Sequence, residues 1–440
     1  MRIKMIVFVM FLLCMLCGVA EAEVGEGKEQ PCVHIMTQEG RPVVSKEEYV
    51  PSLIQVLNCD EAYALTADGG VKIRGNSTAD QGDEKPYRIK FTKKQNMLGL
   101  HHGEKYKSWV LLRSYWNLAP DYMAFHLADA IFGGKYYHSD STYVNLYING
   151  EYKGIYLLCE QNQAAPGRID VREPKKGEEQ PRTGYLLEMD NYAGDEHPYV
   201  LIGQMSATED IAGERRAFPM RNYSIKSDIR SKEQFSFIRR HLNAVFRILY
   251  EAAVNDRPFM IDAKESAVPA DGTYKTAFEA LDAVMDLESL ANMLILEELV
   301  QNYDVGAGSF YMAVDFTEGS IYPKLTFLAP WDFNWAYYEP ADGGYYACTF
   351  QPPQAGQDRS NAWFILAMKI GGFQDIVKAK WQKLSQSGVL ADAARQVVTD
   401  CEKLAGDLDE TEQWRIEMVR NLETYVLGRI DWLNGQWLNK

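Results

Sequence analysis

The 440-residue chain is long enough to bury a large core, and its 46% hydrophobic and 12% aromatic residues exclude a disordered protein. Its formal net charge of −15 argues against non-specific nucleic-acid binding and favours a basic polypeptide as a macromolecular partner. The histidines and cysteines are scattered without the spacing of a zinc site.

The N-terminus has the pattern of a cleavable signal peptide. A basic start, Met1-Arg-Ile-Lys4, precedes an apolar run over Met5–Val19, and Ala20-Glu-Ala22 fits a small-x-small cleavage site. Because the run is short for a membrane span, we predict that residues 1–22 are removed, with an uncleaved anchor as the alternative. The mature protein is therefore expected to be secreted or held at the cell surface, without a membrane span.

A predicted strand in the N-terminal part of the chain carries two cations. Residues 23–62 are expected to be a linker or edge segment, and a flexible polar loop begins at Arg74. Residues 85–91 alternate between apolar and polar, which predicts a strand with Arg88 and Lys90 on its polar face. Lys90 could contact phosphates as a point charge, and a solvated edge-strand face is the alternative.

A β-hairpin is the strongest local prediction. Asn149-Gly150 separates two alternating segments, residues 142–148 and 151–159, as in a type I′ turn. The second strand delivers Glu160 at its end. Glu160 could pair with Lys90, as kinases pair a strand lysine with a glutamate, or it could be a surface charge.

Two further elements are expected around this hairpin. Residues 121–132 have the pattern of an amphipathic helix, with Asp121 as the simplest N-cap. Residues 184–190 are predicted to form a strand, and we consider it a candidate for the backbone edge that meets a purine.

The central stretch of the chain opens with an apolar helix. Leu287, Leu290 and Leu294 recur at helical spacing, which predicts a helix over residues 287–300. Asp286 is a suitable N-cap immediately before it.

Two acids flank a predicted hairpin after this helix. Asp304 lies in a polar turn just before a predicted strand, residues 309–315. A short turn leads to a second predicted strand, residues 321–329, and Asp332 follows it. Because the strands of a hairpin are antiparallel, both carboxylates are expected at one end of it.

Protein kinases place two acids in this way around the phosphates of ATP. One carboxylate orients the hydroxyl nucleophile, and the other holds a divalent cation. Five aromatic residues close to the second acid favour a functional site, because acids packed among aromatic side chains are usually held there for a reason. They are Trp331, Phe333, Trp335, Tyr337 and Tyr338. Two solvated acids at a hairpin end are the alternative.

Several motifs in this order resemble the CotH (spore coat protein H) kinase family. They are Arg74-Gly-Asn-Ser-Thr, Lys85-Pro-Tyr-Arg-Ile-Lys-Phe, the hairpin over residues 144–160, Asn302-Tyr-Asp304 and Pro330-Trp-Asp-Phe-Asn-Trp335. The likeness runs from about residue 71 to the Trp-rich C-terminal helix.

The resemblance implies an α+β protein with a divergent two-lobed protein-kinase-like fold. A β-rich nucleotide-binding lobe would cover residues 63–230, and a mainly helical lobe residues 231–440, with the catalytic hairpin at 302–335. The implied activity is that of an atypical extracytoplasmic protein kinase, which transfers the γ-phosphate of ATP to Ser or Thr of secreted or coat proteins. Its cofactors would be ATP with Mg²⁺ or Mn²⁺.

The resemblance also implies roles for individual residues. Asp304 would be the catalytic-loop acid, and Asp332 and Asn334 would be the metal ligands. Lys90 would meet the nucleotide phosphates with Glu160 as its partner. Arg74, in the family's Arg-Gly-Asn loop, would be a further nucleotide-binding residue.

Two departures from the kinase pattern weaken the expected metal site. The family often has an acid where this chain has Asn334, and kinases have Asn where it has Ser309; neutral oxygens hold magnesium less well than carboxylates. A catalytically weak or inactive kinase-fold surface or adhesion protein is therefore the alternative. A carbohydrate-active enzyme using Asp304 and Asp332 as acid and base is a third possibility. As a kinase substrate we expect a basic or Ser-rich secreted or coat protein, and no nucleic acid.

Overall fold

The computed structural model describes most of the chain and divides it into two units. The described residues are 28–75, 79, 82, 84–113, 118–195, 199–202, 206–211, 214–217, 221–351 and 358–438, so the predicted signal peptide lies outside them. The first unit comprises Met1–Leu118, Asp140–Gln161 and Asp400–Ile416, and the second comprises Ala119–Ser139, Asn162–Thr399 and Glu417–Lys440.

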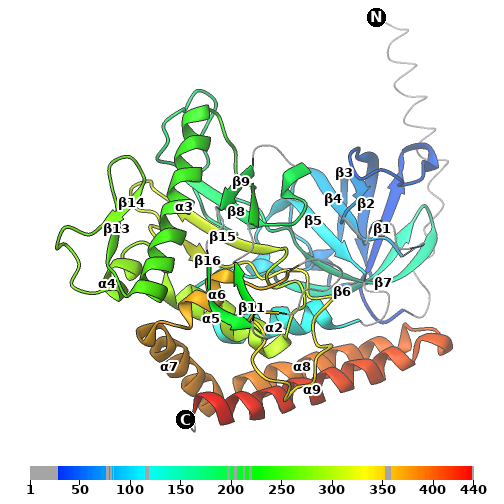
Figure 1. Cartoon of the computed structure of the whole chain (residues 1–440). Coiled ribbons are helices and arrows are strands. Elements are labelled where there is room, and N and C mark those ends of the chain that lie inside the picture. The colour runs from blue at the N-terminus through cyan, green and yellow to red at the C-terminus, as the bar shows by residue number, and fades with distance from the viewer. Residues whose placement is uncertain are drawn as a thin grey trace, which may run out of the picture. The chain divides into compact units, whose positions relative to one another are not determined.

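The first unit is a closed β-barrel with the strand order β1-β2-β3-β4-β5-β7-β6, labelled in Figure 1. Its strands are β1 (Cys32–Thr37), β2 (Val50–Leu57), β3 (Leu65–Ile73), β4 (Tyr87–Gln95), β5 (Tyr106–Leu112), β6 (Ser141–Ile148) and β7 (Glu151–Glu160). The pairs are antiparallel except β1 with β6, which is parallel and closes the barrel. Closure leaves no exposed sheet edge.

The barrel corrects the predicted domain division. Within residues 23–62, the described part from residue 28 onward is not a linker or edge segment, because β1 and β2 are integral strands of the closed barrel. In β2 the alternating residues Ser52, Ile54 and Val56 are buried, a pattern with period two that predicts a half-buried strand.

The predicted hairpin at Asn149-Gly150 is confirmed by β6 and β7. Asn149 has φ 53° and Gly150 φ 82°, which is the left-handed pair that a type I′ turn requires. The Asn149 side-chain oxygen also accepts a hydrogen bond from the Thr37 backbone N–H at 2.8 Å, which ties the turn to the end of β1.

The second unit contains a five-stranded sheet with the order β16-β15-β8-β12-β9. Its strands are β8 (Gly184–Met189), β9 (Tyr199–Ile202), β12 (Arg221–Ile225), β15 (Phe310–Asp315) and β16 (Thr326–Phe327). Because β8 is hydrogen-bonded to β12 on one side and β15 on the other, it offers no free backbone edge to a purine, and that prediction is wrong.

Helices and two small ribbons complete the described chain. The helices are α2 (Pro120–Phe132), α3 (Lys232–Asn255), α4 (Ala277–Asp282), α5 (Leu287–Val300), α6 (Ala362–Ala367), α7 (Gly371–Ser387), α8 (Val389–Glu402) and α9 (Trp414–Trp437). The ribbons pair β10 (Ser206–Ile211) with β11 (Glu214–Ala217) and β13 (Phe259–Ile261) with β14 (Ala267–Pro269).

Helix α5 is buried and leads into the candidate site. Every residue in it except Glu288 is buried, as in a helix enclosed on all sides. Asp286 caps its N-terminus by accepting the Ser289 N–H at 3.0 Å, which confirms the predicted cap. The helix ends at Gln301, whose φ of 45° turns the chain sharply into the polar segment that carries Asp304.

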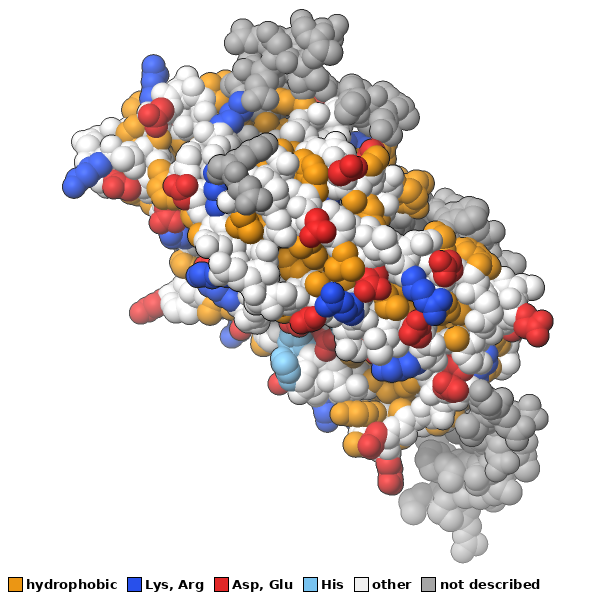
Figure 2. Space-filling model, turned by 90° about the horizontal axis from the view of Figure 1, so that it is seen from below, with side chains coloured by type: hydrophobic (Ala, Val, Ile, Leu, Met, Phe, Trp, Pro, Cys, Tyr) orange, Lys and Arg blue, Asp and Glu red, His pale blue; other side chains and the backbone are white. Residues whose placement is uncertain are grey.

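The predicted α+β class is confirmed, with a β-rich N-terminal part and a helical C-terminal part. A closed barrel stands where a kinase lobe was expected, so the kinase-like architecture stays a prediction. Acidic and basic side chains are mixed across the face drawn in Figure 2. Among the described helices, none combines the length and the apolar character that crossing a bilayer requires.

Candidate functional site

The hairpin of β15 and β16 brings the two acid-bearing segments together. The strands are antiparallel, with Met312 opposite Phe327. Beyond the open end of the hairpin, the Tyr303 backbone N–H donates to the Trp335 carbonyl at 3.2 Å. The segments before β15 and after β16 therefore lie beside each other, as the pairing predicts.

The second strand is shorter than predicted. Only Thr326 and Phe327 belong to β16, whereas residues 321–329 were expected to be a strand. Leu325 bridges to Met285 instead, with its N–H bonded to the Val284 carbonyl at 3.0 Å. The hairpin is thus anchored to the residues that lead into α5.

Asp304 lies in a tight turn, and both its backbone N–H and its carbonyl are hydrogen-bonded. Its N–H donates to the Asn302 side-chain oxygen at 3.1 Å, and its carbonyl accepts the N–H groups of Ala307 and Gly308 at 2.8 and 3.1 Å. Asn302 is buried and hydrogen-bonded to Glu297, a buried acid in the last turn of α5. Burial raises the pKa of Glu297 to about 8, so this carboxyl is protonated and uncharged at neutral pH. Its hydrogen bond with Asn302 supports the Asp304 turn.

Asp332 lies beside Ser309, the position at which kinases have Asn. The Ser309 hydroxyl donates to the Asp332 carboxylate over 3.5 Å, a long contact. Both residues have left-handed backbones, with φ 52° and 68°. Such conformations are costly for non-glycine residues and cluster at functional sites, so the pair is held in place by its surroundings.

Asp332, its contact Ser309 and Asn334, two residues further along the loop, carry oxygen atoms of the kind that suits a hard cation. The Asn334 side-chain oxygen is buried and has no hydrogen-bond partner. Carboxylate, amide and hydroxyl oxygens are the ligands that magnesium and calcium prefer, so Asp332, Asn334 and Ser309 fit such an ion. Within the described residues, His, Cys, Asp and Glu alone form no group of three that could hold a metal, so the neutral oxygens are essential to this fit.

The Asp332 loop is fixed to helix α2. The Asp121 carboxylate accepts the Phe333 backbone N–H at 2.8 Å, and Phe125 packs against Trp331 with ring centroids 5.7 Å apart. The prediction that Asp121 caps α2 is wrong, because the N-cap position is Ala119. An acid in the first turn of a helix looks the same in sequence whether it caps the helix or holds another loop.

Arg359 was missed by the sequence analysis and is bound to Asp304. Its guanidinium forms an ion pair with the Asp304 carboxylate and lies over the Tyr303 ring, 4.1 Å from the centroid. Both members of the pair are only about one-fifth exposed, at 19% and 22%. Arg359 comes from a segment without helical or strand periodicity, so the sequence held no signal for this contact.

The backbone around Arg359 is clamped to the Asp304 turn. Arg221 donates from its guanidinium to the carbonyls of both Gly306 and Asp358, and Asn361 donates to the Val305 carbonyl at 2.8 Å. A Cβ at Gly306 would lie 2.2 Å from the Arg359 carbonyl. Glycine is therefore required here by the close approach of two backbones.

The predicted pair between Lys90 and Glu160 is not formed. Glu160 is fully buried and is bonded to His101 Nδ1 at 3.0 Å and to the Asp140 backbone N–H at 3.1 Å. In the barrel register Glu160 is opposite Trp109, which is opposite Ile89, so Lys90 belongs to the other face of β4. A shift of one residue in the strand register moves a side chain to the other face of the sheet. The register between strands that are distant in the chain could not be predicted from the sequence.

The remaining predicted phosphate contacts belong to the barrel unit. Lys90 is exposed, with its ammonium 5.8 Å from the centre of the Tyr49 ring. Arg74 follows β3, and its backbone N–H donates to the Pro86 carbonyl at 3.0 Å. The structure thus brings Asp304, Asp332 and Asn334 to one hairpin of the second unit. The other predicted site residues belong to the barrel unit: Arg74, Lys90 and Glu160.

Comparison with known protein families agrees with the resemblance. The family model described as CotH kinase protein matches residues 71–433, which is most of the chain. No curated protein matches the sequence. The chain therefore belongs to the CotH kinase family.

Proposed function

We propose that this protein is an extracytoplasmic, ATP-dependent protein kinase that phosphorylates Ser or Thr of secreted or coat proteins. The observation that carries the proposal is the meeting of the Asp304 turn and the Asp332 loop at one end of the β15–β16 hairpin. Membership of the CotH kinase family supports the same class of activity.

Asp304 is the acid proposed to act on the acceptor. Its carboxylate would accept the hydrogen bond of the acceptor hydroxyl and take its proton as the oxygen attacks the γ-phosphorus of ATP. The new oxygen–phosphorus bond forms as the bond to the β,γ-bridging oxygen breaks, and ADP leaves. Positioning supplies most of the rate in such a transfer, so a rigid turn at Asp304 is an advantage.

Asp332, Asn334 and Ser309 would hold the divalent cation. The bound ion would neutralise charge on the β- and γ-phosphates. The protein's own part is to present one carboxylate and two neutral oxygens from a loop that Asp121 fixes through the Phe333 N–H.

The nucleotide contacts predicted in the barrel unit are proposed from the resemblance to the family. Lys90 is proposed to meet the phosphates, and Arg74 to lie in the nucleotide-binding loop. Glu160 is no longer proposed as the ion-pair partner of Lys90, because His101 and the Asp140 N–H occupy its carboxylate. Its proposed role is to support this part of the barrel.

The location and the substrate are proposed from the sequence. The N-terminal pattern of residues 1–22 supports export, and the acidic chain favours a basic or Ser-rich protein as the acceptor rather than a nucleic acid.

A catalytically weak or inactive surface-binding protein is the second candidate. The ion pair between Arg359 and Asp304 favours it, because the guanidinium takes the carboxylate that the acceptor hydroxyl would need. The neutral side chains of Ser309 and Asn334 favour it as well.

A thermal-shift titration with ATP and Mn²⁺ separates the two candidates. The kinase proposal predicts a rise in melting temperature that needs both ligands and is lost in Asp332→Ala, because binding to the native state alone stabilises it. No shift at millimolar nucleotide would contradict the kinase proposal and favour the surface-binding protein.

A further inference from the structure

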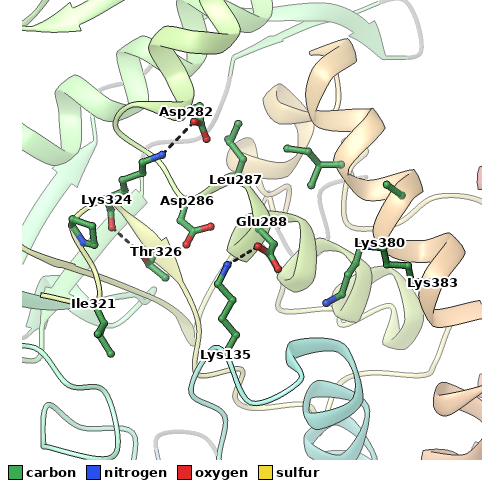
Figure 3. A pocket seen from close by; sticks show the side chains of 13 residues that line it. Lys135, Asp282, Asp286, Leu287, Glu288, Ile321, Lys324, Thr326, Lys380 and Lys383 are labelled. Atoms are coloured by element: carbon green, nitrogen blue, oxygen red, sulfur yellow. Dashed lines mark hydrogen bonds and ion pairs between the residues drawn. The ribbon is translucent and has the colours of Figure 1, made fainter. Parts of the chain in front are cut away.

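A groove outside the candidate active site lies between the start of α5 and one face of α7. It has a volume of about 650 Å³. Figure 3 shows the side chains that line it, which come from both helices, from the chain after α2 and from the turn between β15 and β16. The lining residues include Leu287 and Glu288 of α5, Ile376, Lys380 and Lys383 of α7, and Ile321 of the hairpin turn. We call it the α5–α7 groove.

The acidic residues that line the α5–α7 groove already have ion-pair or hydrogen-bond partners within the protein. Glu288 pairs with Lys135 at 2.5 Å, and Asp282 pairs with Lys324 at 3.3 Å (Figure 3). Asp286 accepts the Tyr136 hydroxyl on both carboxylate oxygens, at 3.0 and 2.9 Å, besides capping α5. No carboxylate of the groove is left over for a ligand cation.

Two lysines of α7 remain without an ion-pair partner among the described residues. Lys380 and Lys383 are one turn apart on α7 and line the same groove. Lys380 is partly buried, and burial lowers its pKa. Glu288 acts in the opposite direction on the pKa of Lys380, but that carboxylate is already paired with Lys135. A partly buried lysine without an ion pair of its own can bind an anionic group.

Aliphatic side chains lie next to these cations. Ile321 is 66% exposed, whereas Leu287 is buried. Ile376 is on α7 one turn before Lys380 and lines the groove as well. An occupant must therefore carry both an anionic and an aliphatic group.

We propose that the α5–α7 groove is a docking site for an extended acidic and aliphatic segment of the protein substrate. Its carboxylates would meet Lys380 and Lys383, and its aliphatic side chains would cover Ile321 and Ile376. This inference rests on the proposed kinase function only for the statement that the docked protein is the substrate.

The placement of the groove fits a docking role. Leu287 and Glu288 are the first residues of α5, whereas Asp304 follows its last turn. A helix of this length spans about 20 Å, so an extended peptide needs at least about six residues to reach from the groove to the acid. The substrate would therefore carry its docking segment six or more residues from the phosphorylated Ser.

The acidic character of the whole chain does not conflict with an acidic docking segment. At physiological ionic strength, charges further apart than about 8 Å are largely screened. A bound carboxylate therefore responds to the charged side chains of the groove, its lysines and its paired acids, rather than to the net charge of −15.

Fluorescence polarisation with a labelled peptide tests the proposal on the full-length mature protein. The probe is an eight-residue peptide of alternating Leu and Glu, and the comparison peptide replaces Glu by Lys. We expect the acidic probe to bind in a salt-dependent manner and Lys383→Glu to weaken binding by about fivefold or more. Lys378→Glu is the matched control, since it makes the same charge change on α7 outside the groove and should leave binding unchanged.

The outcomes separate this proposal from the kinase proposal. Absence of binding at millimolar peptide, or equal loss in Lys383→Glu and Lys378→Glu, overturns the docking site whether or not the protein transfers phosphate. Binding that Lys383→Glu alone weakens supports the docking site even if phosphate transfer is absent.

Discussion

Arg359 forms an ion pair with Asp304, the acid proposed to orient the acceptor hydroxyl. The Arg359 guanidinium also lies over the Tyr303 ring. Arg221 donates hydrogen bonds to the carbonyl of Asp358, next to Arg359, and to the carbonyl of Gly306 in the Asp304 turn, which joins the two segments. The Arg359 guanidinium therefore competes with an acceptor hydroxyl for the Asp304 carboxylate.

Replacing Arg359 should free the Asp304 carboxylate for the acceptor hydroxyl. We expect Arg359→Ala to raise the rate of phosphate transfer by about threefold to tenfold, because a partly exposed ion pair holds the carboxylate by roughly 1 kcal/mol. Transfer of labelled phosphate to a Ser-containing protein measures the effect. Arg395→Ala removes an exposed arginine that pairs with Asp392 and should change nothing. Slower transfer in Arg359→Ala, at an unchanged melting temperature, would mean instead that Arg359 positions the acid.

The close contact at Gly306 predicts a large difference between two neighbouring glycines. A Cβ at Gly306 meets the Arg359 carbonyl at 2.2 Å, whereas one at Gly308 meets nothing within 4 Å. We expect Gly306→Ala to lower the free energy of unfolding by about 1–3 kcal/mol. Gly308→Ala should leave it unchanged or slightly higher. Urea denaturation of both variants checks this, and equal stabilities would show that the two backbones do not pack as described.

A carboxylate at position 334 should strengthen cation binding. The Asn334 side-chain oxygen, two residues after Asp332 in the chain, is buried without a hydrogen-bond partner, and a charged oxygen holds magnesium more tightly than a neutral one. We expect Asn334→Asp to lower the Mn²⁺ concentration needed for half-maximal thermal stabilisation by about tenfold. Ser309→Ala should raise that concentration. Identical titrations for the wild type and both variants would place the cation elsewhere.

The buried acid beneath the Asp304 turn predicts a pH dependence of stability. Burial raises the pKa of Glu297 from 4.5 to about 8, so the folded state holds a proton that the unfolded chain loses above pH 4.5. Stability should therefore fall as pH rises from about 4.5 to about 8, by on the order of a few kcal/mol.

Glu297→Gln should remove this dependence, because the amide stays neutral at every pH. We expect the variant to melt at a higher temperature than the wild type at pH 8 and to differ little at pH 5. Thermal unfolding at the two pH values measures it. A wild-type stability that does not change between pH 5 and pH 8, or a variant that melts lower at pH 8, would show that Glu297 is charged in the folded protein.

Local patterns predicted the elements that build the site. Asn149-Gly150 specified its turn by conformation alone, and the apolar run after Asp286 specified α5 with its cap. The antiparallel rule then placed the segments of Asp304 and Asp332 side by side, because a hairpin joins residues close in sequence.

Contacts between distant segments could not be predicted. Glu160 binds His101 and not Lys90, because the barrel register sets opposite faces for residues that sequence spacing leaves ambiguous. Asp121 holds the Phe333 N–H, and Arg359 reaches Asp304 from a segment without periodicity. Such pairings depend on packing of the whole unit, which no local pattern encodes.

The most direct measurement is phosphate transfer from labelled ATP by wild-type protein and by Asp304→Asn, in the presence of Mn²⁺ and a Ser-rich acceptor. Asn keeps the size of the side chain but cannot take the hydroxyl proton. The account predicts transfer by the wild type and a loss of at least about a hundredfold in the variant, with nucleotide binding retained. Equal transfer by the two proteins would contradict the role given to Asp304, and no transfer by the wild type would contradict the kinase proposal.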